Sequence, residues 1–226
     1  MALANPIMNP RPLEGLRTIV FDNDGVIVDS YEANMVYYGT IRKDLGLPPL
    51  TDAEKRYVHT RTHNEAMRHI VPADKLDRAF EIGRDFDASL LHPYFKRSSG
   101  LREFLWWLRD AGFNLAVNTS RGHSMGMILD LLDLRGFFQP VITSAMVSVP
   151  KPHPEGLFRI MHAHGVQPHE VAYIGDSAVD EKAAAASGVR FWAYRNHGLN
   201  AEVHIDHFMD IKAAMQRCYK GSALTF

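Results

Sequence analysis

Short apolar runs alternate with helical patterns along most of this chain, and this alternation limits the folds open to it. Five runs have the character of buried parallel strands, at residues 17–22, 114–120, 140–145, 170–176 and 189–195. Helical patterns lie between most of them, at residues 101–112, 124–136, 154–165 and 180–188. Repeated strand–helix–strand units with short links predict an α/β fold, an open parallel sheet with helices on both faces.

One interruption of about 70 residues, from Ser30 to Ser98, separates the first strand from the next helix. It has helical periodicity and no convincing strand, and structureless connections of that length are rare. We therefore predict a small all-helical cap over residues 30–98, inserted into a Rossmann-like core made of residues 1–29 and 99–226. The two ends of the insert should meet near Asp29 and Ser99, above the edge of the sheet, where a lid could act.

The composition is that of an ordinary globular protein and excludes several classes of function. Of 226 residues, 46% are hydrophobic and 23% charged, and the net charge is −1. Such a balance gives no field to attract nucleic acid or an anionic membrane. Cys218 is the only cysteine, which favours a reducing compartment. The prolines of the first 17 residues argue against an export signal, so we expect a cytoplasmic protein that needs neither nucleic acid nor membrane. Monomer and homodimer both remain open.

Acidic residues follow two of the predicted strands. The stretch TIVFDNDGVIVD ends its apolar run in Asp22 and Asp24, and YIGDSAVDEKAA supplies Asp176 and Asp180. Burying like charges is costly, whereas carboxyl ends of parallel strands are where ligands bind. Two carboxylates can divide labour as nucleophile and acid, and a hard cation would remove their repulsion. Ligation by oxygen alone suits Mg2+ better than Zn2+.

Three further residues favour phosphate as the ligand. Thr119 and Ser120, in VNTSRG, lie at a strand-to-helix turn, where a hydroxyl and backbone N–H groups favour an anion. Lys151 lies between two prolines in VPKPHPEG, which can fix its ammonium group as a point charge. A carboxylate nucleophile, a metal, a hydroxyl and a lysine together indicate a phosphoryl-transfer site.

Four motifs, DNDGVIVD, NTSR, KPHPEG and GDSAVDEKAAAASGV, occur in this order and resemble the signature motifs of the haloacid dehalogenase-like hydrolase superfamily. The resemblance extends from about residue 16 to 215, and the insert resembles the superfamily's α-helical cap of the C1 type. Small phosphatases of the phosphoglycolate phosphatase and β-phosphoglucomutase type look most similar. One departure is Val26, where the first motif usually has Thr.

The resemblance implies a role for each site residue. Asp22 would be the nucleophile that forms an aspartyl-phosphate, and Asp24 would protonate the leaving group and then activate water. Asp22, the backbone carbonyl of Asp24, and Asp176 would bind Mg2+. Thr119, Ser120 and Lys151 would bind the phosphoryl oxygens, and Asp180 would support the metal water or Lys151. The substrate would be a small phosphorylated metabolite.

Other readings of the same residues stay open. The halide-displacing branch of the superfamily lacks an acid at Asp24, so its presence favours phosphate chemistry. A sugar-phosphate mutase would use the same constellation, and a phosphonate-cleaving enzyme would need a cap lysine, for which Lys55 is the candidate. A phosphate-binding protein without catalytic activity would be expected to lack one of these site residues, and none is missing. For Asp180, the alternative is a purely structural role as an acid in the first turn of a helix, where it complements the helix dipole.

A second polar cluster, HTRTHNEA, lies in the predicted cap. Arg61 is the candidate for binding a carboxylate or second phosphate of the substrate, and the alternative is a solvated surface residue. His59 and His63 have the spacing of a helical metal pair, but no third ligand is evident. Arg121, beside Thr119, would contact the substrate or cap the edge of the sheet.

Overall fold

The computed structural model describes residues 13–59, 63–122 and 125–219 of the chain. The chain divides into two compact units. One consists of Met1–Val28 with Arg97–Phe226, and the other is the intervening segment Asp29–Lys96.

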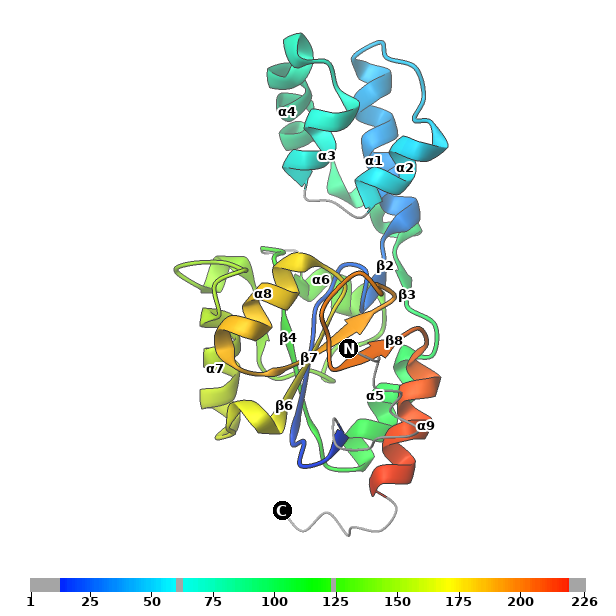
Figure 1. The fold of residues 1–226 in the computed structure, drawn as a ribbon. Coiled ribbons are helices and arrows are strands. Elements are labelled where there is room, and N and C mark those ends of the chain that lie inside the picture. Colours follow the sequence, from blue (N-terminus) through cyan, green and yellow to red (C-terminus); the bar gives the residue numbers. More distant parts are fainter. Residues whose placement is uncertain (1–12, 60–62, 123–124, 220–226) are drawn as a thin grey trace. The chain divides into compact units, whose positions relative to one another are not determined.

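The first unit is built on a six-stranded parallel sheet, which confirms the predicted α/β fold (Figure 1). From edge to edge the strand order is β5-β4-β1-β6-β7-β8. The strands are β1 (Thr18–Phe21), β4 (Asn114–Asn118), β5 (Val141–Ile142), β6 (Val171–Gly175), β7 (Arg190–Tyr194) and β8 (Val203–Ile205). Strand β8 was not predicted, because three residues are too short a run to reveal a period of two.

The register of the central strands brings their carboxyl ends to one level. Phe21, the last residue of β1, lies opposite Val117 of β4 and Ile174 of β6. The chain proceeds from β1 outward to β4 and β5 and then returns to β6 on the other side of β1. Ligand sites in open parallel sheets lie at such a reversal of strand order. The residues that follow β1, β4 and β6 are therefore neighbours, as the sequence predicts.

Helices cover both faces of this sheet (Figure 1). Helices α7 and α8 pack together on one face, and α5 and α9 pack together on the other. Gly165 and Gly188 end α7 and α8 in the left-handed conformation, in which glycine avoids the steric cost of a Cβ atom. The helices of this unit are α5 (Leu101–Asp110), α6 (Met125–Leu131), α7 (Glu155–His164), α8 (Ala178–Ser187) and α9 (Phe208–Tyr219), with 3-10 turns at Ser144–Met146 and Pro168–Glu170.

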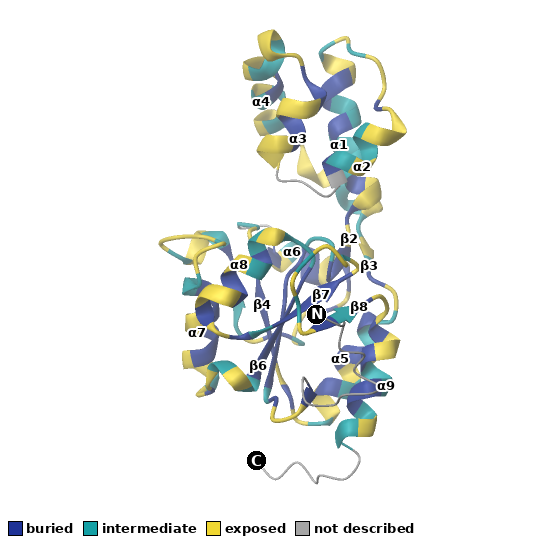
Figure 2. Cartoon of the chain, viewed as in Figure 1, coloured by how far each residue is buried: buried dark blue, intermediate teal, exposed yellow. Residues whose placement is uncertain are grey.

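The central strand β1 is buried on both faces, so its apolar run does not alternate with polar residues (Figure 2). Val20 belongs to the hydrophobic cluster that contains Leu157 of α7 and Ala183 of α8. Phe21 points to the opposite face, where its ring packs edge-on to Phe104 of α5 at 6.3 Å between centroids. These two cores hold the end of β1 rigidly, and the chain leaves it directly at Asp22.

The second unit is helical and has its own core. Its hydrophobic cluster is formed by nine buried residues from the helices and the loops between them, among them Ile41, Met67 and Ala79. Arg42 is buried beside this core, and its guanidinium donates to Glu54 and to the carbonyls of Pro48 and Ile70. The unit contains α1 (Tyr31–Asp44), α2 (Asp52–His59), α3 (His63–Ile70), α4 (Leu76–Asp85) and 3-10 turns at Ala73–Lys75 and Ala88–Tyr94. A separate two-stranded sheet pairs β2 (Val28–Asp29) with β3 (Lys96–Arg97).

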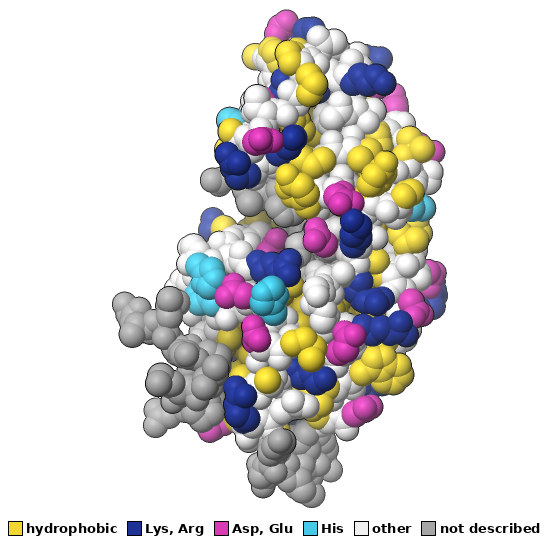
Figure 3. Space-filling view, turned by 90° about the vertical axis from the view of Figure 1, so that its right-hand side faces the viewer, with side chains coloured by type: hydrophobic (Ala, Val, Ile, Leu, Met, Phe, Trp, Pro, Cys, Tyr) yellow, Lys and Arg dark blue, Asp and Glu magenta, His cyan; other side chains and the backbone are white. Residues whose placement is uncertain are grey.

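Within the described residues, every helix is too short or too polar to span a membrane. On the face of the molecule drawn in Figure 3, basic and acidic side chains are intermixed and form no continuous basic surface.

Candidate active site

Lys151 occupies the centre of a buried network at the carboxyl edge of the sheet. Its ammonium group donates to Asp22 Oδ1 at 2.8 Å, to Asp180 Oδ1 at 2.6 Å and to the Tyr173 hydroxyl at 3.0 Å. Only 5% of the Lys151 side chain is exposed. Charge-assisted hydrogen bonds of this length are among the strongest in proteins. The lysine thus fixes the Asp22 carboxylate through one oxygen and leaves Oδ2 for chemistry.

Asp180 has two structural roles at once. Its Oδ2 atom accepts from the backbone N–H of Ser177 at 3.2 Å and from the Ser177 hydroxyl, which makes a capping box at the start of α8. Its Oδ1 atom binds Lys151 and accepts from the Tyr173 hydroxyl at 2.6 Å. A Cβ atom at Gly175 would lie 2.4 Å from that of Asp180, so the glycine permits this close approach. The two roles that the sequence offers Asp180 as alternatives, an acid in the first turn of a helix and a partner of Lys151, therefore occur together.

Asp176 follows β6 and faces the turn after β1. Oxygen atoms of Asp22, Asp176 and Asp180 lie within 4.8 Å of one another. A Cβ atom at Gly25 would lie 1.9 Å from Asp176 Oδ2, so only glycine lets the turn after Asp24 approach this carboxylate. The backbone carbonyl of Asp176 accepts from Asn196 Nδ2 at 2.8 Å. Ser177, rather than Asp176, is the N-cap of α8, which leaves the Asp176 carboxylate free of that role.

The Lys151 ammonium, which Asp22 and Asp180 share, cannot neutralise all three carboxylates of the cluster. Burial and the charge of Asp180 raise the pKa of the Asp22 carboxyl to about 7, although the charge and the hydrogen bond of Lys151 lower it. Burial and the charges of Asp22 and Asp180 also raise the pKa of Asp176 well above its usual range. For Asp180, burial is outweighed by the Lys151 ammonium and the hydrogen bonds, which lower its pKa. Keeping all three carboxylates ionised therefore requires positive charge beyond that of one lysine.

The residues present fit a hard divalent cation. All donors in the cluster are carboxylate oxygens, which Mg2+ prefers. The oxygens of Asp180 are occupied by Lys151, Tyr173 and Ser177. Among the described residues, no hydrogen bond or ion pair engages the Asp176 carboxylate. Asp22 and Asp176 are thus the two carboxylates of the cluster with oxygens available to a cation.

Asp24 and Thr119 lie in the more exposed part of the same edge. Both carboxylate oxygens of Asp24 accept from the Arg121 guanidinium, Oδ1 from Nη2 at 2.6 Å and Oδ2 from Nε at 2.8 Å. Thr119 is buried, and its hydroxyl accepts from the Arg121 backbone N–H at 3.1 Å. Ser120, the residue between Thr119 and Arg121 in the sequence, is exposed. Arg121, which the sequence left open between a substrate contact and a cap of the sheet edge, is thus the ion-pair partner of Asp24.

The candidates from the helical unit are only partly described. Arg61 and the side chain of His59 lie outside the described residues. His63 lies among the rings of Tyr37, Tyr38 and Phe80, and burial lowers the pKa of its imidazole.

Three site residues were missed by the sequence reasoning, namely Tyr173, Ser177 and Asn196. Tyr173 is fully buried, and its hydroxyl bridges Lys151, Asp180 and the carbonyl of Asn118 at 3.0 Å. The one available signal was a hydroxyl in the otherwise apolar strand VAYIG. Buried tyrosine hydroxyls need a partner, so that signal called for a polar neighbour without saying which.

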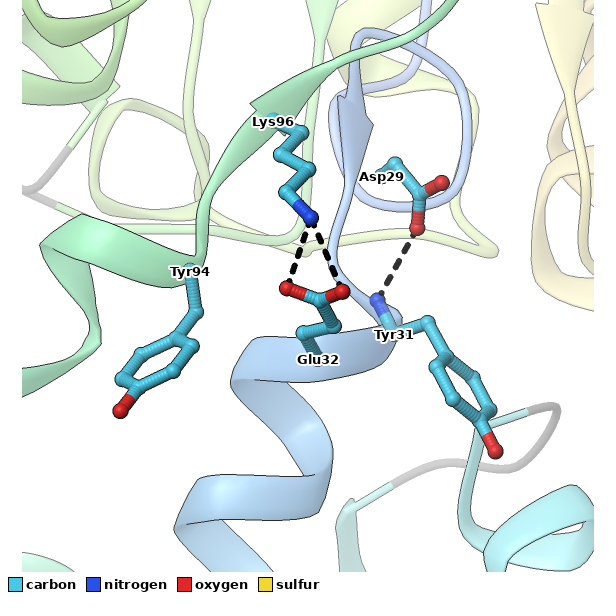
Figure 4. Close-up of a pocket in the computed structure, with 5 residues that line it drawn as sticks. All are labelled: Asp29, Tyr31, Glu32, Tyr94 and Lys96. Carbon is cyan, nitrogen blue, oxygen red and sulfur yellow. Dashed lines mark hydrogen bonds and ion pairs between the residues drawn. The ribbon is translucent and has the colours of Figure 1, made fainter.

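A pocket of about 180 Å3 in the helical unit is lined by none of the predicted site residues (Figure 4). Lys96 Nζ binds both oxygens of Glu32, at 2.9 and 2.8 Å, and the Tyr31 N–H donates to Asp29 Oδ1 at 3.2 Å. Tyr31 and Tyr94 point away from each other on opposite sides of this ion pair. The lysine of this pocket is therefore already paired by a neighbouring acid, and we assign it no ligand.

Known proteins are similar to this chain in sequence and in fold. The sequence model of the haloacid dehalogenase-like hydrolase family matches residues 19–194. The phosphoglycolate phosphatase of Pseudomonas putida is 27% identical over 217 residues, which cover 89% of this chain and 79% of that protein. The phosphoglycolate phosphatase of Nitrosococcus oceani is 26% identical over 212 residues, which cover 86% of this chain and 94% of that protein.

A solved structure agrees with these relatives. The crystal structure of a haloacid dehalogenase superfamily hydrolase of subfamily IA from Geobacter sulfurreducens is 34% identical. It has a TM-score of 0.77 and covers 89% of this chain and 97% of its own. The chain therefore belongs to the haloacid dehalogenase-like hydrolases. Within that family it resembles the phosphoglycolate phosphatase and β-phosphoglucomutase type, as the four motifs indicate.

Proposed function

We propose that this hydrolase is a Mg2+-dependent phosphatase that cleaves a small phosphorylated metabolite through an aspartyl-phosphate on Asp22. The observation that carries the proposal is the Asp22 carboxylate, held by Lys151 through one oxygen within a cluster of three carboxylates at the carboxyl edge of the sheet. Binding by Asp22, Asp176 and the Asp24 carbonyl would hold Mg2+, which supplies positive charge that offsets the developing charge of phosphoryl transfer.

The residues of the chain divide the reaction into two displacements. Asp22 Oδ2 attacks phosphorus, the ester P–O bond breaks, and Asp24 gives its proton to the leaving oxygen. In the second displacement, Asp24 takes a proton from water as the water oxygen attacks phosphorus and the bond to Asp22 breaks. Lys151 and Thr119 bind phosphoryl oxygens, with Ser120 in the same turn, and Asp180 orients Lys151. The products are inorganic phosphate, the alcohol and the original Asp22 carboxylate.

The names of the relatives suggest a substrate to test first. Phosphoglycolate phosphatases from two organisms match this chain over most of its length. We therefore propose a small phosphorylated acid, with phosphoglycolate as the first candidate, and Arg61 as the candidate that reads its carboxylate. The single cysteine, Cys218, supports action in the reducing cytoplasm.

No observation favours the phosphonate-cleaving alternative. A Schiff-base lysine must be neutral to attack a carbonyl, whereas Lys55 is paired with Asp52 at 2.9 Å. The hydrogen bond and the charge of Asp52 raise the pKa of Lys55, which favours its charged form.

The experiment is a phosphate-release assay over a panel of phosphorylated metabolites, with and without Mg2+. The wild-type protein should release phosphate, a chelator should abolish the release, and readdition of Mg2+ should restore it. Asp22→Asn should lose at least about 10^3-fold in kcat because the nucleophile is removed. Asp110→Asn, at an exposed position at the end of α5, is the matched control and should leave kcat unchanged.

Retained turnover in a folded Asp22→Asn protein, checked by circular dichroism, would contradict the assignment of the nucleophile. A moved phosphate group instead of free phosphate would identify a mutase.

A further inference from the structure

The ion pair between Arg121 and Asp24 conflicts with the role proposed for Asp24. Its two hydrogen bonds, at 2.6 and 2.8 Å, engage both carboxylate oxygens in the bidentate arrangement that guanidinium groups form with carboxylates. A carboxylate held in this way directs both oxygens at the arginine. Neither oxygen can then exchange a proton with a leaving group, so the pair must open before the first displacement.

The backbone at Arg121 is fixed, so the change must come from the side chain. The Arg121 N–H donates to the Thr119 hydroxyl at 3.1 Å, and the Arg121 carbonyl accepts from the N–H of Ser144 at 2.9 Å. These bonds tie Arg121 to the turn in which Thr119 would bind a phosphoryl oxygen. The guanidinium is thus attached beside the proposed phosphoryl position and can turn toward it without moving the chain.

Electrostatics favour such a turn when substrate arrives. The side chains of Arg121 and Asp24 are 26% and 42% exposed, so the pair is less buried than the Lys151 network and less costly to separate. Burial lowers the pKa of the Arg121 guanidinium, but the charges of Asp24 and Asp22 raise it, so the guanidinium also interacts with the charge of the proposed nucleophile. A phosphoryl dianion carries more charge than a carboxylate and matches the guanidinium fork equally well.

We propose that Arg121 exchanges partners during the reaction, leaving Asp24 for the phosphoryl group of the bound substrate and so releasing Asp24 for proton transfer. Arg121 is then a substrate-binding residue, and the resting ion pair holds Asp24 away from chemistry until a phosphoryl group is present. This inference rests on the proposed phosphatase function.

A double-mutant cycle on the binding of inorganic phosphate tests the exchange without relying on turnover. Isothermal titration calorimetry in the presence of Mg2+ would give Kd for the wild type, Arg121→Gln, Asp24→Ala and the double variant. Arg121→Gln should bind phosphate at least about tenfold more weakly, because charge-assisted hydrogen bonds are lost. Asp24→Ala should bind it about three- to tenfold more tightly, because Arg121 no longer has a competing partner.

The decisive comparison is the effect of Asp24→Ala in the Arg121→Gln background. Exchange predicts that the gain in affinity disappears there. A gain that persists would show that Asp24 merely repels phosphate, and this result would overturn the proposal, as would an unchanged Kd in Arg121→Gln. Arg121→Lys, which keeps the charge without the planar fork, should recover part of the lost affinity.

Two controls separate this inference from the proposed function. Arg159→Gln removes an arginine that pairs with Glu155 on α7, and it should leave the phosphate Kd unchanged. Turnover by the wild type is measured separately with 4-nitrophenyl phosphate. If the wild type hydrolyses this ester but the cycle shows no coupling, the exchange is wrong and the phosphatase assignment stands. If the wild type binds phosphate without hydrolysing the ester or any metabolite of the panel, the phosphatase assignment is wrong.

Discussion

The two halves of the candidate site hold their carboxylates in opposite ways. In the buried half, Lys151 binds Asp22 and Asp180 with at most 10% of any of these side chains exposed. In the outer half, Asp24 is 42% exposed and contacts Arg121. Separating charges that are buried is costly, whereas partly exposed pairs contribute little. The comparison teaches that a single site can fix the proposed nucleophile firmly and hold the proposed proton-transfer group less tightly.

The largest effect should come from the pH dependence of stability in the metal-free protein. A rise in the pKa of Asp22 from 3.8 to about 7 corresponds to about 4 kcal/mol of lost stability at high pH. The folded state holds the Asp22 proton more tightly than the unfolded state, so stability falls as pH rises from about 4 through 7. About 3 kcal/mol of this should fall between pH 5 and 8.

Asp22→Asn removes the titrating group, so the variant should not lose this stability as the pH rises. The difference in free energy of unfolding between the variant and the wild type should therefore shift by about 3 kcal/mol in favour of the variant between pH 5 and 8. Chemical denaturation in the presence of a chelator measures it. The matched change in the outer half, Asp24→Asn, should alter stability by no more than about 1 kcal/mol at pH 8. A wild type that is more stable than Asp22→Asn at pH 8 would mean that attraction by Lys151 outweighs burial.

A second prediction concerns the space that glycine provides for Asp176. Gly25 and Gly15 both have positive φ, +76° and +70°, but only Gly25 has a close neighbour, Asp176. Alanine at either position should cost about 1 kcal/mol of backbone strain. Gly25→Ala should cost about 2 kcal/mol more because it must displace the carboxylate.

Gly25→Ala should also raise the Mg2+ concentration for half-maximal activity by about tenfold, since a proposed ligand has moved. Denaturation and a Mg2+ titration would measure both effects, with Gly15→Ala as the control. Equal Mg2+ requirements in the two variants would remove Asp176 from the proposed metal site.

The smallest effect should come from Tyr173→Phe, which removes one hydroxyl from the buried half. We expect a loss of about 1–2 kcal/mol in stability, because Asp180 loses a hydrogen-bond donor. The kcat should fall about tenfold as Lys151 and Asp180 lose their common contact.

Tyr219→Phe is the matched control for this change. The Tyr219 hydroxyl is hydrogen-bonded too, donating to the Leu13 carbonyl at 2.6 Å and accepting from the Leu16 N–H at 3.1 Å. Its removal should cost similar stability and leave kcat unchanged. Equal kcat values for both variants would show that the Tyr173 hydroxyl serves folding alone.

The parts of the site that could be predicted are those that depend on position along a strand. Asp22, Thr119 and Asp176 each follow an apolar run, and parallel strands bring such residues to one edge. The contacts of Tyr173 could not be predicted, because its distance from Asp180 depends on how the turn between β6 and α8 is built. The partner of Arg121 was equally hidden, since Asp24 lies 97 residues away in sequence.

The sequence by itself therefore determined the α/β fold, the family and the identity of the acidic residues at the sheet edge, because strand periodicity and short motifs are local properties of the chain. Only the tertiary structure decided how those acids differ. Burial and the charge of Lys151 give Asp22, Asp176 and Asp180 different pKa values. Asp24 lies nearer to solvent, in an ion pair with Arg121. Burial and ion pairing depend on segments far apart in sequence, and these fix each carboxylate's charge and freedom to move.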